Sequence, residues 1–194
     1  MQSSRTDAEL LKAAAGKDKG AFKELMERYQ GRIYSLAYRF SGDRETAQEL
    51  TQDIFFKVYR SAGRYRPDAR FFTWLYRIAA NHCINFTKKR RRDPLQKAVA
   101  SEDDHESGFC LRDDAPGIAE QLEQRERAMI VRSALDSLPE RQKMAVMLLR
   151  FDDLSYREIS EVLGCSVSAV ESLIHRATTS LKRTFLKRMP GSEI

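Results

Sequence analysis

Apolar residues recur at the spacing of an α-helix along most of the chain, and no segment alternates apolar with polar residues as a strand does. Capping residues divide this pattern into separate segments. Thr6 and Glu9 have the spacing of a capping box, and Asp43, Ser155 and Ser166 each stand just before a new amphipathic run. The sequence therefore predicts an all-α protein.

Residues 1–92 contain four segments with a helical apolar pattern. Helices joined by short turns can bury one core and fold independently at about this length. The first expected helix begins at Thr6 and ends at residues 16–18, and the second ends at Gly42. The third runs from about Asp43 to Ala62, and the fourth runs from near Phe71 to a point before Pro94.

Residues 118–194 again show helical periodicity. The helices expected there cover residues 118–138, Pro139 to about Arg150, Ser155 to Gly164, and Ser166 to a stop at residues 190–191. The last two predict a helix-turn-helix, although a plain αα-hairpin shares this pattern. In a helix-turn-helix the second helix enters the major groove by its N-terminal residues. The outward-facing candidates on that helix are Ser168, Ala169, Glu171, Ser172, His175, Arg176 and Thr179.

The net charge of +6 is distributed unevenly. Residues 1–92 carry 20 Lys and Arg against 10 Asp and Glu, residues 93–117 carry 2 against 7, and residues 118–194 carry 12 against 11. A basic domain, a flexible acidic linker and a nearly neutral domain are therefore expected in that order. The basic domain implies a polyanionic partner. The linker could lie in a basic channel built for nucleic acid, or only keep the basic domain soluble.

The helix expected from Phe71 ends in the basic run of residues 88–92. Leu75, Ile78, Ala79 and Phe86 can face a core. Rings can stack on unpaired bases and cations can follow backbone phosphates, so the combination favours a nucleic-acid surface. Any one of the aromatic residues, taken alone, is more typical of a core. The other faces of the helix are left to Phe72, Trp74, Tyr76, Arg77, Asn81, Asn85 and Lys88.

The helix expected from Asp43 to Ala62 also has a face that its core does not need. Carboxylates repel phosphate, so aromatic residues beside them suit a protein partner better than DNA. An ordinary solvated helix face is the alternative. The residues on this face are Gln48, Glu49, Gln52, Asp53, Phe56, Lys57 and Tyr59.

Several classes of function are disfavoured. No run of about eighteen apolar residues occurs and the N-terminus lacks an apolar signal core, so we expect a cytoplasmic protein without a membrane span. Cys83, Cys110 and Cys165 are scattered, which fits reduced thiols, and the Cys and His residues lack the spacing of metal ligands. We expect no metal, no cofactor and no enzyme activity, because no nucleophile, base and acid are grouped.

Both halves resemble bacterial sigma factors of the extracytoplasmic-function group, and the resemblance covers nearly the whole chain. AFKELMERYQGRIYSLAYRF, AQELTQDIFFKVYRS and YRPDARFFTWLYRIAANHCINF resemble sigma region two. LDSLPERQKMAVMLLRFDDLSYREISEVLGCSVSAVESLIHRA resembles region four. Only a linker stands where other sigma factors have a region three domain, which is typical of this group.

The resemblance implies a non-enzymatic specificity subunit of RNA polymerase, with region two in residues 1–92, a linker in residues 93–117 and region four in residues 118–194. Region two would bind the coiled coil of the largest polymerase subunit and open the minus-ten element of promoter DNA. Region four would contact the flap of the second-largest subunit and read the minus-thirty-five element. An anti-sigma factor usually holds family members inactive.

The resemblance also implies three sets of site residues. The polymerase contacts would be Gln52, Asp53, Phe56, Lys57 and Tyr59. The minus-ten contacts would be Tyr65, Arg66, Phe71, Thr73, Trp74, Arg77, Asn81, Asn85 and Lys88. The minus-thirty-five contacts would be Ser166, Ser168, Ala169, Glu171, Ser172, His175 and Arg176.

The chain departs from the family pattern over residues 168–173, where it has SAVESL instead of a run with two cations. The usual upstream sequence preference of the family is therefore not transferred to this chain. Glu171 could accept a hydrogen bond from cytosine N4, and Arg176 could bind guanine or a phosphate.

Two other functions remain open on the residues alone. A stand-alone helix-turn-helix regulator would bind a palindromic site without polymerase, but nothing in residues 1–92 resembles a ligand pocket. An adaptor that binds only protein through its exposed aromatic residues would associate independently of salt, whereas phosphate contacts make binding steeply salt-dependent.

Overall fold

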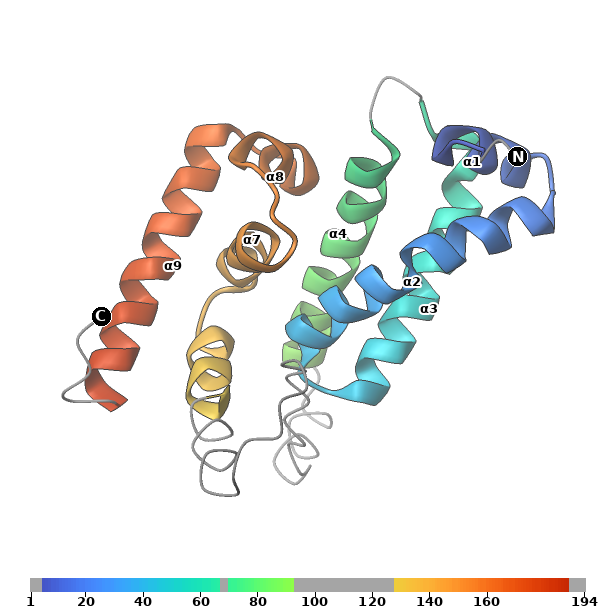
Figure 1. The fold of residues 1–194 in the computed structure, drawn as a ribbon. Helices are drawn as coiled ribbons and strands as arrows, with labels where there is room; N and C mark the ends of the chain where they lie inside the picture. Colours follow the sequence, from blue (N-terminus) through green and yellow to red (C-terminus); the bar gives the residue numbers. More distant parts are fainter. Residues whose placement is uncertain (1–4, 67–69, 93–127, 189–194) are drawn as a thin grey trace, which may run out of the picture.

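A computed structural model describes residues 5–66, 70–92 and 128–188, and all regular structure in these ranges is helical (Figure 1). The all-α prediction is confirmed. The predicted linker of residues 93–117, the start of the following helix at residues 118–127 and the stop at residues 190–191 lie outside the described residues. The N-terminal half contains α1 (Asp7–Ala15), α2 (Lys19–Ser41), α3 (Arg44–Ser61), the short 3-10 helix η1 (Ala62–Arg64) and α4 (Phe71–Arg92).

Side-chain caps begin the N-terminal helices, at Thr6 and Asp43 as the sequence predicts and at Asp18, which the sequence analysis did not single out as a cap. Thr6 forms the capping box of α1, with its hydroxyl accepting from the Glu9 N–H. The Asp18 carboxylate accepts from the Ala21 N–H at 3.0 Å to cap α2. Asp43 caps α3 by accepting from the Thr46 N–H at 2.6 Å. Each cap satisfies an N–H that the helix itself leaves without a partner.

The core of the N-terminal half lies between α2, α3 and α4, which pack against one another. Leu25, Leu36, Leu50, Ile54 and Leu75 are all fully buried there. Of the core residues predicted for α4, Leu75 and Ala79 are buried, while Ile78 and Phe86 are half-buried and pack against the core. Four helices thus bury one contiguous apolar cluster, as their stripes predict.

The C-terminal half contains a helix over residues 128–136, then α7 (Glu140–Phe151), α8 (Tyr156–Leu163) and α9 (Val167–Arg188). Ser155 and Glu158 form a capping box at the start of α8. Gly164 ends α8 with φ at 60°, a left-handed conformation that glycine adopts without strain. The short helix, tight turn and long helix form the predicted helix-turn-helix.

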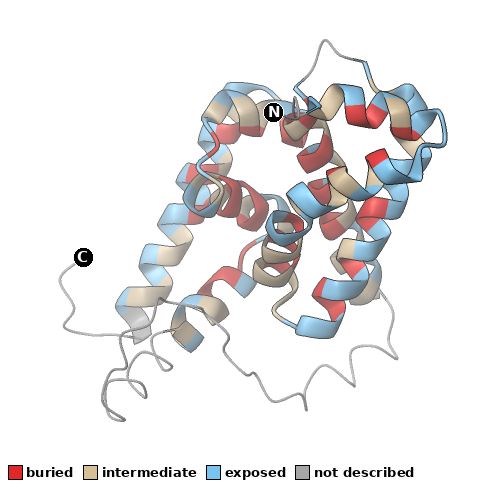
Figure 2. Cartoon of the chain, turned by 45° about the vertical axis from the view of Figure 1, so that its right-hand side comes forward, coloured by how far each residue is buried: buried red, intermediate tan, exposed pale blue. Residues whose placement is uncertain are grey.

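The two halves lie side by side, and α4 is the helix that joins them (Figure 1). It packs on α2 and α3 with one face and on α7 and α8 with another, and α2 also contacts α7. Buried residues face this central region from both halves (Figure 2). No helix in the part of the chain that the structure describes is long and apolar enough to span a membrane.

Candidate nucleic-acid interface and neighbouring surfaces

One face of α4 carries a row of polar and cationic side chains. Arg77, Asn81, Asn85 and Lys88, which we call the α4 row, are all exposed. Their spacing of three or four residues places them on one side of the helix. Four of the predicted minus-ten residues therefore share a continuous surface that offers cations for phosphates and amides for base edges.

An aromatic cluster lies at the start of α4. The Trp74 ring is 5.3 Å from the Tyr65 ring and 5.9 Å from the Phe71 ring, measured between centroids. Tyr65 and Trp74 are half-buried and Arg66 is exposed, whereas Phe71 and Thr73 are buried. The structure therefore offers Tyr65, Arg66 and Trp74 to a ligand, and the burial of Phe71 and Thr73 favours a role in supporting the cluster.

Tyr76 corrects the expected outward face of α4. It was assigned to a face outside the core, but it is fully buried and its hydroxyl donates to Asp152 at 2.9 Å. Phe72, from the same set, is half-buried with its ring 4.2 Å from that of Tyr76. Tyr76 is buried because the C-terminal half covers this side of α4. Asp152 of that half accepts the hydrogen bond from the Tyr76 hydroxyl.

The predicted polymerase face of α3 lies open. Gln52, Asp53, Phe56, Lys57 and Tyr59 are all exposed. Phe56 is 60% exposed, which is unusual for a phenylalanine, and its ring is covered in part by an arginine of the same helix, Arg60, at 5.7 Å. An open ring among charged residues is the composition of a protein-binding anchor.

His82 is a neighbour of this face that the sequence did not single out. Its Nδ1 atom contacts the Lys57 ammonium and its Nε2 atom lies 3.2 Å from an Asp53 oxygen. Burial is the main cause that lowers the pKa of His82, with Lys57 adding to it and Asp53 opposing it. A neutral ring with its proton on Nε2 accepts from the lysine and donates to the aspartate, so it holds both side chains in place.

The N-terminal part of α9 presents the predicted minus-thirty-five residues. Ser166, Ser168, Glu171, Ser172, His175 and Arg176 are exposed and Ala169 is half-buried. Two of the hydroxyls already have backbone partners: Ser166 accepts from the Ala169 N–H at 3.2 Å, and Ser172 donates to the Ser168 carbonyl at 3.0 Å. Glu171, His175 and Arg176 are therefore the side chains best placed to reach DNA.

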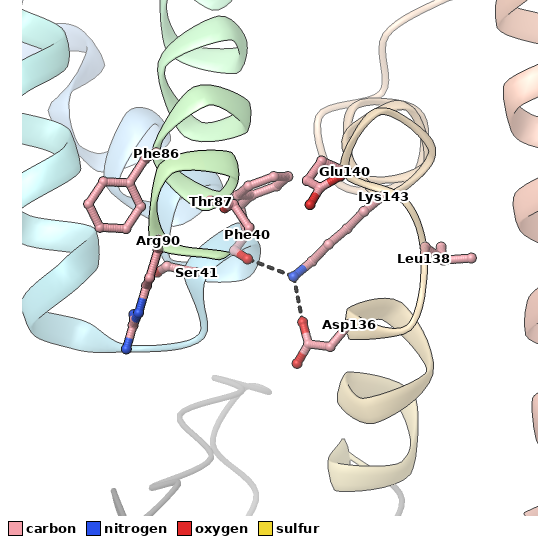
Figure 3. A pocket seen from close by; sticks show the side chains of 9 residues that line it. All are labelled: Phe40, Ser41, Phe86, Thr87, Arg90, Asp136, Leu138, Glu140 and Lys143. Carbon is pink, nitrogen blue, oxygen red and sulfur yellow. Dashed lines mark hydrogen bonds and ion pairs between the residues drawn. The ribbon is translucent and has the colours of Figure 1, made fainter. Parts of the chain in front are cut away.

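Polar residues at the junction of the two halves were also missed by the sequence analysis. Lys143 of α7 is 7% exposed and donates to the Phe40 carbonyl at 2.6 Å and to Asp136 (Figure 3). Burial raises the pKa of Asp152, and hydrogen bonds from Tyr76 and charges from Arg39 act in the opposite direction. No periodic signal marks such residues, because their partners in the other half lie 76 to 113 positions away in the chain.

The same junction contains an open pocket with a volume of about 170 Å³. Figure 3 shows that it lies between the end of α4 and the start of α7. Its lining residues are Phe40, Ser41, Phe86, Thr87, Arg90, Asp136, Leu138, Glu140 and Lys143. The two halves therefore pack less tightly against each other here than a protein core packs.

In the part of the chain that the structure describes, no group of three Cys, His, Asp or Glu side chains could hold a metal ion. Cys83 is buried, which raises the pKa of its thiol to about 12, and Cys165 is half-buried. Both described cysteines are free thiols. Cys110 lies outside the described residues.

A basic helical domain with an open row of cations and amides, followed by a helix-turn-helix domain, defines a two-domain DNA-binding protein of transcription. Residues 25–93 match the family model of Sigma-70 region 2, and residues 128–181 match that of Sigma-70, region 4. The chain belongs to the extracytoplasmic-function (ECF) sigma factors of RNA polymerase. This membership confirms the main prediction over the stand-alone regulator.

The relatives cover almost the whole chain. The RNA polymerase sigma-H factor of Pseudomonas aeruginosa is 35% identical over an alignment 192 residues long, which covers 94% of this chain and 95% of the relative. The ECF RNA polymerase sigma-E factor of Escherichia coli K12 is 36% identical over an alignment 185 residues long, which covers 93% of this chain and 95% of the relative. The structure of CnrH in complex with the cytosolic domain of CnrY is similar with a TM-score of 0.63 and 25% identity, over 91% of this chain and 95% of CnrH.

Proposed function

We propose that this chain binds core RNA polymerase, directs it to a specific set of promoters and promotes opening of the minus-ten element. The observation that carries the proposal is the α4 row, which lies in the open on the same helix as the half-buried ring of Trp74. Cations, amides and an accessible ring on one helix are what a displaced single strand requires.

The energetics favour capture of bases that have left the duplex. Extruding a base costs a few kcal/mol, and stacking it on an aromatic side chain returns roughly 1–3 kcal/mol. Tyr65 and Trp74 supply the rings, and the amides of Asn81 and Asn85 can bind base edges. Arg77 and Lys88 can follow the phosphates. Contacts with polymerase would add to the binding energy from stacking, amide and phosphate contacts, so the chain need not melt DNA alone.

The α3 face would dock on the largest polymerase subunit. Phe56 offers an exposed ring for a partner pocket, and Asp53 and Lys57 offer charges of both signs beside it. Interface anchors of this kind carry most of the binding energy, while the residues around them exclude water. The α3 face is also too acidic near Glu49 and Asp53 to follow a phosphate backbone.

The helix-turn-helix would read the minus-thirty-five element through the N-terminal part of α9. Arg176 can bind guanine or a phosphate, and Glu171 can accept from cytosine N4. The remainder of region four would contact the polymerase flap. This chain need not prefer the same minus-thirty-five sequence as other family members, because two cations of their recognition helix are replaced here.

The protein would act without catalytic residues, in the cytoplasm, and under the control of an anti-sigma factor. Similar structures with bound partners support the last point: CnrH is seen with the cytosolic domain of CnrY. The sigma factor RpoE of Bartonella quintana, seen with the anti-sigma factor NepR, shares the fold with a TM-score of 0.60 at 18% identity, over 84% of this chain and 96% of RpoE.

Footprinting of unpaired thymines on promoter DNA tests the proposal. Core polymerase and this chain together should make the minus-ten thymines reactive, and neither component alone should do so. A steep loss of binding with salt is expected, because phosphate contacts release counterions. Tight binding of a palindromic site without polymerase would instead establish the stand-alone regulator, and salt-independent association with protein alone would establish the adaptor.

A further inference from the structure

The ring of His82 binds two charged residues of the α3 face. His82 belongs to α4, which packs against α3. Its Nε2 atom lies 3.2 Å from an Asp53 oxygen, and its Nδ1 atom contacts the Lys57 ammonium. Two of the proposed polymerase contacts are therefore held by a residue that lies on a different helix.

Packing fixes the ring independently of these two partners. The side chain of His82 is only 11% exposed, whereas that of Asp53 is 55% exposed. Ile78 and Phe86 stand about one turn before and after His82 on α4, and both pack against the core. The ring therefore offers its two nitrogens at fixed positions. Lys57 is exposed, and without a partner its long side chain would sample many rotamers.

Asp53 and Lys57 have the spacing of a direct ion pair. They stand four positions apart on α3 with the acid first, which is the favoured order on a helix. A direct pair would lay both charges along α3, where each would satisfy the other and offer less to a partner. In the structure both side chains bind the ring from its two sides. The ring thus competes with a pairing that would weaken this surface for docking.

Only the neutral ring can hold both charges. With its proton on Nε2, the ring donates to Asp53 and accepts from Lys57 through Nδ1. A protonated ring has a proton on both nitrogens, so it cannot accept from the ammonium and repels it. Burial lowers the pKa of His82 and Lys57 lowers it further, while Asp53 and Glu49, also on α3, oppose them. The neutral form therefore prevails at neutral pH.

We propose that His82 is a positioning residue for polymerase docking: its neutral ring keeps Asp53 and Lys57 apart and presents both charges, beside Phe56, to the largest polymerase subunit. The inference rests on the proposed function, since it takes the α3 face as the docking surface. Side chains that are already ordered lose less freedom on binding, so the ring strengthens docking without touching the polymerase.

The affinity of the full chain for core polymerase, measured without DNA, tests this role. His82→Ala should weaken binding about fivefold to tenfold, the loss expected when a hydrogen bond to a charged group disappears. His82→Gln should restore most of the affinity, because its carboxamide can accept from Lys57 and donate to Asp53. Normal binding by His82→Ala, or an equal loss in both variants, would overturn the proposal.

A double-mutant cycle separates positioning from a loss of packing. In a chain that carries Asp53→Asn and Lys57→Met, neither charge is left for the ring to present. His82→Ala should then change the affinity by less than about twofold. A ring that only supports the packing of α4 on α3 would cost as much in this background as in the wild type, and that result would contradict the proposal.

The pH dependence of docking gives a second readout. The pKa of His82 lies below its ordinary value of 6.5, so its ring is neutral above about pH 6.5. The affinity of the wild type should fall as the pH is lowered through the pKa of His82, because the protonated ring releases Lys57. His82→Gln should lack this part of the fall, whereas the groups of the polymerase titrate equally with both chains. Superimposable pH profiles would rule out the positioning role.

Nitrogen NMR of the full chain tests the ring without polymerase. The imidazole signals of His82, assigned by their loss in His82→Gln, should show a neutral ring with its proton on Nε2 at about pH 7. A proton on Nδ1, or a charged ring, would refute the proposal. If the wild-type chain does not bind core polymerase, the proposed function fails and this inference with it. If the wild type binds and His82→Ala binds equally well, only this inference fails.

Discussion

The hydroxyl of Tyr76 donates a 2.9 Å hydrogen bond to a carboxylate oxygen of Asp152, which lies 76 positions later in the chain. The bond joins the helix that carries the candidate minus-ten residues to the end of α7 in the other half. It also explains why a tyrosine that the sequence places outside the core face of α4 can be fully buried, since its one polar group has a partner.

The contact between the two halves should depend on pH through Asp152, which binds Tyr76 and Arg39 of the N-terminal half. Its pKa is raised above the usual 3.8, mainly by burial at this contact, so the chain binds a proton there more readily when the halves are in contact than when they are apart. The stabilisation of the contact by this proton is present below about pH 3.8 and is lost as the pH rises through the raised pKa. The radius of gyration should therefore increase as the pH rises through this window.

Asp152→Asn supplies the control for the pH experiment, because it removes the titrating group and keeps its shape. The variant should lack this part of the pH dependence. Asp18 and Asp43, whose pKa values are lowered by their capping bonds, act in the opposite direction, but they are unchanged in both chains. The same pH response in wild type and variant would contradict the assignment to Asp152.

Trp74→Ala should impair promoter opening while leaving association with core polymerase intact. Loss of one stacking surface should reduce the extent of opening about tenfold, since stacking is worth roughly 1–3 kcal/mol per base. Thymine reactivity and polymerase affinity are measured on the same protein. Trp74→Phe, which keeps a ring, should retain most of the opening. Equal loss of opening and association in Trp74→Ala would show that the residue is only part of the core.

Phe56→Ala should weaken binding to core polymerase about tenfold or more, as expected for a central aromatic anchor. The side chain is 60% exposed, so the thermal unfolding midpoint should hardly change. Lys23→Ala, at a side chain on α2 that is 79% exposed, is the control and should bind polymerase normally. Normal affinity of Phe56→Ala would remove the α3 face from the polymerase interface.

Arg176→Ala should weaken protection of the minus-thirty-five element by about tenfold, because a cation that binds guanine or phosphate is lost. Lys182→Ala removes an exposed cation farther along the same helix and should have a smaller effect. Protection is measured by footprinting with polymerase present. An unchanged footprint in Arg176→Ala would exclude the residue from the upstream contact.

The helix boundaries were predictable because they depend on local sequence. Thr6, Asp43 and Ser155 each accept a hydrogen bond from an N–H three residues later, and Gly164 adopts the left-handed conformation that ends α8. The α4 row was predictable for a related reason, since residues three or four apart share a helix face whatever lies elsewhere.

The interface between the halves was not predictable in this way. A buried lysine such as Lys143 has the sequence signature of a solvated one, and its partner Phe40 is 103 positions earlier. The same holds for Tyr76, whose outward placement was wrong because the covering half is distant in the chain. His82 was overlooked because its two partners belong to the preceding helix, 25 and 29 positions away.

The cap that Lys143 places on the end of α2 has a consequence for synthesis of the chain. Phe40 and its neighbours leave the ribosome long before Lys143 is made, so the end of α2 is bound only to water while region two folds. Region two must therefore be stable without its cap. The cap can form only after Lys143 of α7 has been made.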